Sequence, residues 1–511
     1  MSSVLDEVDA VEPAPDILSV TVGARPAFLL GIDVGTSGVR AALFDDRGSE
    51  IAGASSRTLR HLAAFSDLGV LDADAIVAQV IETIDDLIVS RAEAHGVRFI
   101  AISCFWHSLI GVDQNGRPTT PLLSWADTRA AKSAALLTEQ FDEQEAHRRS
   151  GCRFHASYWP AKLHWLQQEQ KEVFEGTNQW LGFSEYLCGQ LFDSTSMSVS
   201  MASATGLFDQ RKCEWDWKFI NSLKIPKQSL PNIARENDWP PLSSEFADRW
   251  PALSEARLVT IIGDGAANNI GGGCCTRDRF ALMVGTSGAM RVMYAGNPPD
   301  RLPFELWSYR ADRSRVVVGG ALSDGGGLYR WLTDLMCLGD DPEIEKQLAD
   351  LDADSHGLTI LPFWSGERST GWSAEARGAI LGLTQQTKPV EILRAAMEAV
   401  AYRFALIARA LETLTGTANI VATGNALRAS RVWLQIMADV LGQRLNLTSV
   451  REASTRGAAL LALETLGKIE NLEQHSITIE EIVEPDMSRH RRYLEGLARQ
   501  TRIYETIVRK L

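Results

Sequence analysis

A five-residue segment, Val-Gly-Thr-Ser-Gly, occurs twice in this chain, at residues 34–38 and again at 284–288. Each copy lies between two apolar, strand-like runs, FLLGIDVGTSGVRAALFD in the first case and FALMVGTSGAMRVMYA in the second. A short identity alone arises by chance, but matching flanks indicate a duplication. We therefore expect two related domains, each opening with the same hairpin.

The rest of the chain alternates helical and strand-like patterns. Residues 72–95 have apolar positions at helical spacing and lead into the strand-like run VRFIAIS. The same order returns later, with helices over 390–414 and 430–441, the second closed by Gly442, and the strands ANIVAT and RLNLTS. This pattern predicts an α/β fold. Residues 150–260 are less regular and richer in Trp and Pro, which suggests an insertion that shapes one wall of a cleft.

A chain of 511 residues is too long for one compact core, so two large domains are expected. We place the substrate domain at 27–276 and the nucleotide domain at 277–467. Residues 1–26 are predicted to be a loose acidic leader, and residues 468–511 a peripheral helical segment.

Composition excludes several classes of function. The net charge is -14 and no Lys/Arg-rich run is present, so a nucleic-acid partner is not expected. The seven cysteines are scattered without metal-type spacing and are typical of buried thiols in a reducing compartment. The leader lacks a basic or apolar signal region, and no apolar run reaches about 18 residues. These features predict a cytoplasmic protein without a membrane span.

Both Gly-Thr-Ser-Gly segments are predicted to be tight turns. Such turns offer backbone N–H groups and hydroxyls to an oxyanion, and glycine allows a close approach. For either copy alone an ordinary hairpin loop is the simpler interpretation. Two copies that face each other would form a phosphate clamp, with Gly35, Thr36 and Ser37 on one side and Gly285 and Thr286 on the other.

Asp33 ends the strand before the first turn. Mg²⁺ prefers one or two carboxylates together with water, so Asp33 is a candidate metal ligand. The second copy has Met283 at the matching position, so only the first copy can hold metal. A carboxylate that caps the turn is the alternative interpretation.

Asp264 lies in the run IIGDGAANNIGGG, between a β-branched strand and a glycine-rich helix start. A carboxylate at such a junction is held rigidly and can accept a hydroxyl proton. Phosphoryl transfer requires mainly positioning, charge neutralisation and one carboxylate to align the attacking oxygen. An Asp-Gly turn without a catalytic role is the alternative.

A third group combines aromatic and polar side chains. Sugars bind by stacking on aromatic faces and by pairing their hydroxyls with polar groups. The candidates are Trp106, His107, Trp125, Asp127 and Arg129. Core tryptophans with solvated charges nearby are the alternative.

Two glycine-rich segments, SDGGGLYRWL and ATGNALRAS, each follow a strand and lead into a helix. Helix N-termini after glycine turns suit phosphate or adenosine. Neither segment is a P-loop, because no Gly-Lys-Ser/Thr follows. The candidates here are Gly326, Gly424 and Asn425.

In order and spacing these segments resemble the FGGY family of carbohydrate kinases, from about Phe28 to Gly467. The resemblance implies two actin-like ATPase (ribonuclease H-like) domains that flank a deep cleft, with ATP and Mg²⁺ as cofactors. It implies that Asp264 is the catalytic base and that Asp33 is linked to Mg²⁺, with Asp264 close to the same ion. It places phosphate at Gly35, Thr36, Ser37, Gly285 and Thr286, and the nucleotide at Gly326, Gly424 and Asn425. The family usually has a second glycine where this chain has Asn425, and asparagine tolerates the left-handed conformation.

Within that family, the segments HSLIGVD, SWADTR and MASATGLFD are most similar to gluconate kinases. Gluconate carries a carboxylate, for which His107, Arg129, Arg153, His155 and Lys162 are candidate cations. A xylulose kinase or another polyol kinase is the alternative, because His107 also fits xylulose kinases. A non-catalytic sugar sensor and an actin-like ATPase are rivals of other classes. A small sugar or sugar acid is the expected partner, and a homodimer is compatible with the sequence.

Overall fold

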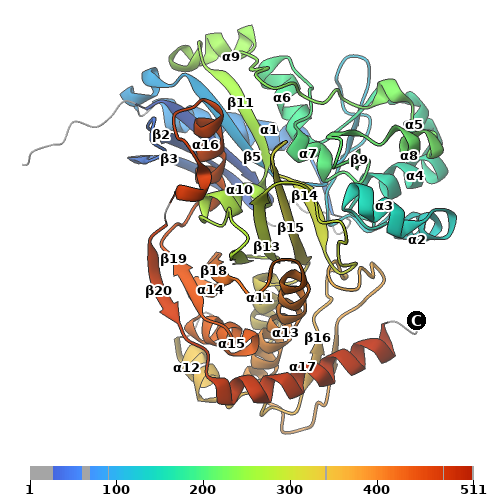
Figure 1. Cartoon of the computed structure of the whole chain (residues 1–511), viewed down its shortest axis with the longest axis vertical. Helices are drawn as coiled ribbons and strands as arrows, with labels where there is room; N and C mark the ends of the chain where they lie inside the picture. Colours follow the sequence, from blue (N-terminus) through green and yellow to red (C-terminus); the bar gives the residue numbers. More distant parts are fainter. Residues whose placement is uncertain (1–26, 60–68, 90, 340–341, 476, 509–511) are drawn as a thin grey trace, which may run out of the picture.

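The computed structural model describes residues 27–59, 69–89, 91–339, 342–475 and 477–508; the leader at 1–26 lies outside them. Two mixed sheets dominate the chain, the first in blue and green and the second in yellow to red in Figure 1. Each sheet has its own large buried core. The α/β architecture expected from the sequence is confirmed.

The first sheet has five strands. In spatial order they are β3 (Glu50–Leu59), β2 (Gly38–Phe44), β1 (Leu29–Gly35), β5 (Phe99–Cys104) and β11 (Arg257–Gly263). β1 and β2 form an antiparallel hairpin that closes at Gly35 and Gly38, which confirms the first predicted turn. β5 and β11 then add in parallel.

The second sheet repeats this order and adds a strand at each edge. Its strands are β14 (Trp307–Arg310), β15 (Arg315–Leu322), β13 (Gly288–Ala295), β12 (Arg279–Val284), β18 (Asn419–Thr423), β19 (Leu445–Thr448) and β20 (Ile479–Val483). β12 and β13 form the matching hairpin, followed by parallel β18 and β19. The shared topology supports the duplication inferred from the repeated segment.

The predicted helices are confirmed where their periodicity was strongest. α1 (Ala73–Val89) precedes β5, and α13 (Pro389–Thr415) precedes β18. α13 begins with Pro389, and the Glu391 carboxylate accepts from the Lys388 N–H at 2.7 Å, so two usual helix-start signals coincide. α15 (Arg431–Leu441) ends at Gly442, whose φ of 65° forms the left-handed cap.

The irregular middle of the chain consists mostly of short helices. They are α2 (Ala131–Gln140), α3 (Glu143–Ser150), α4 (Trp159–Glu169), α5 (Lys171–Gly176), α6 (Phe183–Phe192), α7 (Val199–Ser203), α8 (Trp217–Ser222) and α9 (Ser244–Arg249). Two-stranded pairings join β4 (Val70–Leu71) with β7 (Leu122–Leu123), β6 (Ile110–Val112) with β8 (Gln179–Leu181), β9 (Phe208–Asp209) with β10 (Glu214–Trp215), and β16 (Thr359–Leu361) with β17 (Ala379–Leu381).

The C-terminal part of the chain differs from expectation in two places. Helix α16 (Ala453–Thr465) lies beside the first sheet in Figure 1, although the segments before and after it belong to the second sheet. It packs on α10 (Asp264–Gly271), where a Cβ at Gly457 would lie 1.8 Å from the Ala267 carbonyl. The last segment is also not purely helical or peripheral, because β20 pairs with β19 before α17 (Met487–Ile507) begins.

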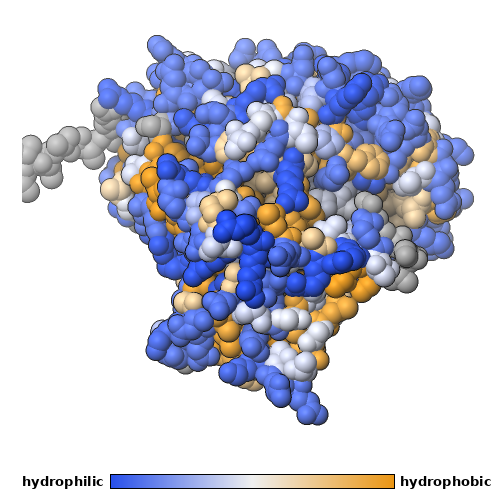
Figure 2. Space-filling model, turned by 60° about the horizontal axis from the view of Figure 1, so that its bottom comes forward, coloured by the Kyte–Doolittle hydropathy of each residue, from blue (hydrophilic) through white to orange (hydrophobic). Residues whose placement is uncertain are grey.

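Hydrophilic residues predominate on the face drawn in Figure 2, and apolar atoms form separate patches. None of the helices in the described ranges combines the length and apolar composition needed to cross a bilayer.

Candidate active site

A cavity of about 100 Å³ lies between the two halves of the chain and contains groups from both. From the first half come Thr36, at the turn between β1 and β2, and Asp264, at the end of β11. β13 and the segment between β16 and β17 supply arginines, and aromatic rings line the rest of the wall. The lining residues used below are Thr36, Trp106, His107, Trp125, Tyr158, Asp264, Arg291, Tyr309, Arg368 and Trp372.

Asp264 is the first residue of α10, so a strand fixes its backbone on one side and a helix on the other. The Gly265 N–H donates to Asp264 Oδ1 at 2.7 Å. Burial raises the pKa of Asp264 to about 6; the positive charge of Arg291 opposes this rise and the negative charge of Asp33 adds to it. A carboxylate with this pKa is ionised at neutral pH and is still basic enough to accept a proton.

The two glycines around Asp264 make room for Trp106. A Cβ at Gly263 would lie 1.8 Å from Cε2 of that indole, and one at Gly265 would lie 2.6 Å from Cζ3. Ser200 binds both the strand end and the indole: its Oγ accepts from the Gly263 N–H at 3.1 Å, and its carbonyl accepts from Trp106 Nε1 at 3.2 Å. The sequence Gly-Asp-Gly is therefore needed to hold the carboxylate against this ring.

We predict that Gly263→Ala destabilises the protein by about 1–3 kcal/mol, because the new methyl must displace a buried indole. Turnover should also fall, because displacement of the Trp106 indole shifts the neighbouring Asp264. Chemical denaturation measures the change. Gly176→Ala is the matched control, because a Cβ there meets nothing within 4 Å. Equal stability of the two variants would contradict this packing.

The pKa of Asp264 predicts a pH dependence. The base must be ionised, so kcat/KM should be constant above the pKa of about 6 and fall about tenfold per pH unit below it. Steady-state rates between pH 5 and about 8 with a coupled ADP assay test this. An acid limb near pH 4, the range of an ordinary carboxyl, would show that burial does not control this group.

Asp33 is buried beside the first turn. Its Oδ1 accepts from Ser103 Oγ at 2.7 Å, and Arg40 Nη1 lies 3.4 Å from its Oδ2. Burial raises its pKa against these two partners. Two buried carboxylates that repel each other are a donor set that fits a divalent cation, so Asp33 and Asp264 would hold Mg²⁺. The ion would neutralise charge on nucleotide phosphates.

His107 faces the cavity from a left-handed backbone position with a φ of 69°. Its Nδ1 donates to the Ala204 carbonyl at 2.8 Å, because a carbonyl can only accept. Burial lowers the pKa of His107 to about 3, so the ring is neutral and Nε2 is an acceptor. His107 can thus accept a hydrogen bond from a substrate hydroxyl.

Aromatic rings close the cavity around His107. Tyr309 is 5.0 Å from Trp106 between ring centroids, and its hydroxyl lies 2.6 Å from that of Tyr158. Trp372 packs against Tyr158 at 6.1 Å. Because Tyr309 and Trp372 belong to the second half of the chain, the pocket is complete only when both halves meet.

Asp127 and Arg129 lie beside the cavity and pair with each other. Arg129 Nη2 donates to Asp127 Oδ2 at 2.6 Å, and its guanidinium lies 4.7 Å from the ring of Trp165. Asp127 lines a small side hollow next to Trp125, together with His155 and Arg368. The structure therefore brings His107 and Trp125 to the main cavity and places the Asp127–Arg129 pair at its margin.

Two other candidate cations bind protein groups. Lys162 donates to the carbonyls of His107, Leu123 and Ser124 at 2.7 to 3.2 Å. Arg153 pairs with Glu143 and stacks on Phe304 at 3.4 Å. Neither lines the cavity or its side hollow.

Sequence reasoning missed Arg291 and Arg368. Arg291 Nη1 and Arg368 Nε are buried and have no hydrogen-bond partner among the described residues. The Arg368 guanidinium lies 4.5 Å from the ring of Trp125. The signal for Arg291 was an arginine within the apolar strand AMRVMY; Arg368 lies in a loop whose sequence carries no comparable signal.

The second turn packs against the two glycine-rich helix starts. The Gly326 N–H donates to the Gly285 carbonyl at 2.7 Å, and a Cβ at Gly424 would lie 2.3 Å from the Val284 carbonyl. Gly424 has a φ of 96°, which favours glycine. The structure thus gathers Gly285, Thr286, Gly326, Gly424 and Asn425 around the second turn. Ser37, which belongs to the first turn, is exposed.

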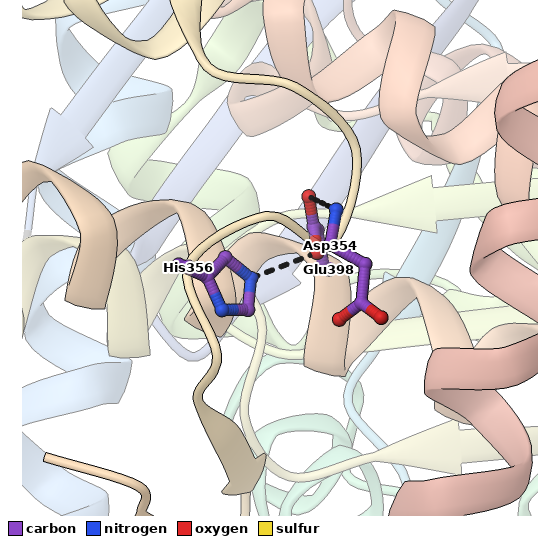
Figure 3. A group of neighbouring side chains, drawn as sticks. All are labelled: Asp354, His356 and Glu398. Carbon is purple, nitrogen blue, oxygen red and sulfur yellow. Dashed lines mark hydrogen bonds and ion pairs between the residues drawn. The ribbon is translucent and has the colours of Figure 1, made fainter.

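Two other features do not form a catalytic site. A second cavity, of about 420 Å³, lies beside α7, and its Arg315 is paired with Asp312 and Glu464. The group Asp354, His356 and Glu398 in Figure 3 is also paired, because Arg499 binds Asp354 and Arg394 binds Glu398. Arg499 of α17 thus binds the loop before β16, and His356 of that loop contacts Glu398 of α13. The carboxylates are already paired and offer little to a metal.

Comparison with known proteins identifies the family of the chain. The FGGY family of carbohydrate kinases matches with its N-terminal domain at residues 28–271 and its C-terminal domain at 281–465. A gluconokinase of Bacillus subtilis (strain 168) is 29% identical over 463 residues, 88% of this chain and 89% of that protein.

Solved structures give the same result. A ligand-bound xylulose kinase from Lactobacillus acidophilus has a TM-score of 0.85 at 27% identity, covering 94% of this chain and 98% of the other. A gluconate kinase from the same organism has a TM-score of 0.84 at 26% identity with the same coverage.

Proposed function

Since the chain belongs to the FGGY family of carbohydrate kinases, we propose that it transfers the γ-phosphoryl group of ATP to a sugar acid. The proposed reaction converts D-gluconate to 6-phosphogluconate. The resemblance to a gluconokinase and to a gluconate kinase structure supports this substrate.

One observation carries the choice of a sugar acid. His155 Nδ1 accepts from the Ser157 N–H at 3.2 Å, so the proton of this ring is on Nε2. Burial lowers the pKa of His155 to about 3, so the ring is neutral. His155 shares a side hollow of about 10 Å³ with Arg368, and Arg368 also lines the main cavity. The buried Nε of Arg368 lacks a partner among the described residues. A substrate carboxylate in the cavity can accept from this guanidinium, whereas a substrate without one leaves it fewer acceptors.

The proposed step uses Asp264 and His107, which line the main cavity. Asp264 takes the proton of the C6 hydroxyl as its oxygen attacks the γ-phosphorus of ATP. The new O–P bond forms as the bond to the β,γ-bridging oxygen breaks, and ADP leaves with that electron pair. His107 accepts from another hydroxyl, and the aromatic wall excludes water that would otherwise take the phosphoryl group.

An ADP-release screen tests this function. We expect release with gluconate well above the rate without sugar, and weaker release with xylulose, ribulose and glycerol. Xylulose kinase activity is the second candidate, favoured by the structural match to a xylulose kinase. A higher kcat/KM for xylulose than for gluconate would replace the proposed substrate.

A further inference from the structure

Arg291 is a buried cation that no predicted role uses. It lies on β13, where the other residues from Ala289 to Tyr294 are apolar, and it is only 5% exposed. Its Nη1 has no hydrogen-bond partner among the described residues, although the negative charge of Asp264 is near enough to act on its pKa. A buried guanidinium N–H without an acceptor is costly, which indicates that a ligand in the cavity supplies the acceptor.

Two glycines clear the space that Arg291 occupies. A Cβ at Gly319, its partner on β15, would lie 2.9 Å from Arg291 Cγ. A Cβ at Gly265 would lie 3.0 Å from its Nε and 3.3 Å from its Cζ. The guanidinium therefore lies over the residue that follows Asp264, inside the same cavity.

The position beside the base decides what Arg291 can contact. Arg368 lines both the main cavity and the side hollow that contains His155, whereas Arg291 lines the main cavity alone, with its guanidinium next to Gly265, the residue after Asp264. Burial lowers the pKa of Arg291 to about 10, so it stays charged at neutral pH. A fixed cation in a dry cavity stabilises charge that develops during phosphoryl transfer.

We infer that Arg291 is a further catalytic residue, whose guanidinium donates to an equatorial oxygen of the phosphoryl group as it passes from ATP to the substrate hydroxyl. This inference rests on the proposed kinase function but not on the identity of the sugar. The proton still goes to Asp264 and the electron pair to ADP.

The test compares Arg291→Met and Arg291→Lys with wild type. We expect Arg291→Met to lower kcat by about 10²–10³-fold and to change KM for the sugar by less than about threefold, because the contact forms only in the transition state. Arg291→Lys should recover part of the loss by restoring the charge. Arg315→Met, which removes an arginine from β15 outside the cavity, is the matched control and should keep wild-type kcat.

A second readout separates catalysis from folding. ADP with aluminium fluoride mimics the planar phosphoryl group, so its affinity in Arg291→Met should fall by about the same factor as kcat, while ADP alone binds unchanged. An unchanged kcat, a raised sugar KM with normal kcat, or undiminished affinity for the mimic would each overturn the inference. If another polyol replaces gluconate as substrate, the same comparison is made with that polyol. A wrong substrate can therefore be distinguished from a wrong role for Arg291.

Discussion

Replacing Asp264 with Asn should lower kcat by about 10²–10⁴-fold while leaving the affinity for sugar and nucleotide within about threefold. The amide has nearly the shape of the carboxylate and can still accept from the Gly265 N–H, but it cannot take a proton. Steady-state kinetics and calorimetric titration measure the two quantities separately.

The variant also removes one negative charge next to Asp33. The negative charge of Asp33 raises the pKa of Asp264, which means that the two carboxylates repel each other. Asp264→Asn removes this repulsion and should not destabilise the fold. Asp127→Asn is an informative comparison, since that carboxylate pairs with Arg129 at the margin of the cavity. Near-normal turnover in Asp264→Asn would refute its role as base.

Replacing Arg368 with Met should raise KM for gluconate by about 10–100-fold, because a charge-assisted hydrogen bond contributes about 1.5–3 kcal/mol. KM for neutral polyols should change by less than about threefold. Arg368→Lys should retain little of the selectivity, since an ammonium cannot reproduce the planar guanidinium over Trp125.

Arg377→Met is the matched control for this prediction. Arg377 lies in the same segment but is exposed, and among the described residues it donates only to the carbonyls of Ala374 and Ala376. Equal losses for gluconate and for neutral polyols in Arg368→Met would show that Arg368 shapes the pocket without recognising a carboxylate.

Local patterns predicted much of the fold. The hairpins at residues 34–38 and 284–288 and the helix α13 follow from turn chemistry and apolar spacing, which act over a few residues. Helix α16 could not be assigned to the first sheet in this way, because its packing on α10 depends on contacts between Gly457 and Ala267, far apart in the chain.

In the candidate site, too, local sequence patterns indicate some residues and not others. Asp33, Asp264 and His107 lie next to strand ends or turns, which the sequence marks. Arg368 reaches the cavity from a loop of the second half, and Arg291 reaches it only because Gly265 and Gly319 leave space. Such convergence depends on how the two halves meet, and no local pattern records it.

Phosphoryl transfer to gluconate is most directly tested by following the γ-phosphorus of ATP with ³¹P NMR. We expect a new phosphomonoester signal that grows in equal amount with ADP, little inorganic phosphate, and near-complete loss of the new signal in Asp264→Asn. Release of inorganic phosphate without a phosphomonoester, with gluconate and neutral polyols alike, would contradict it.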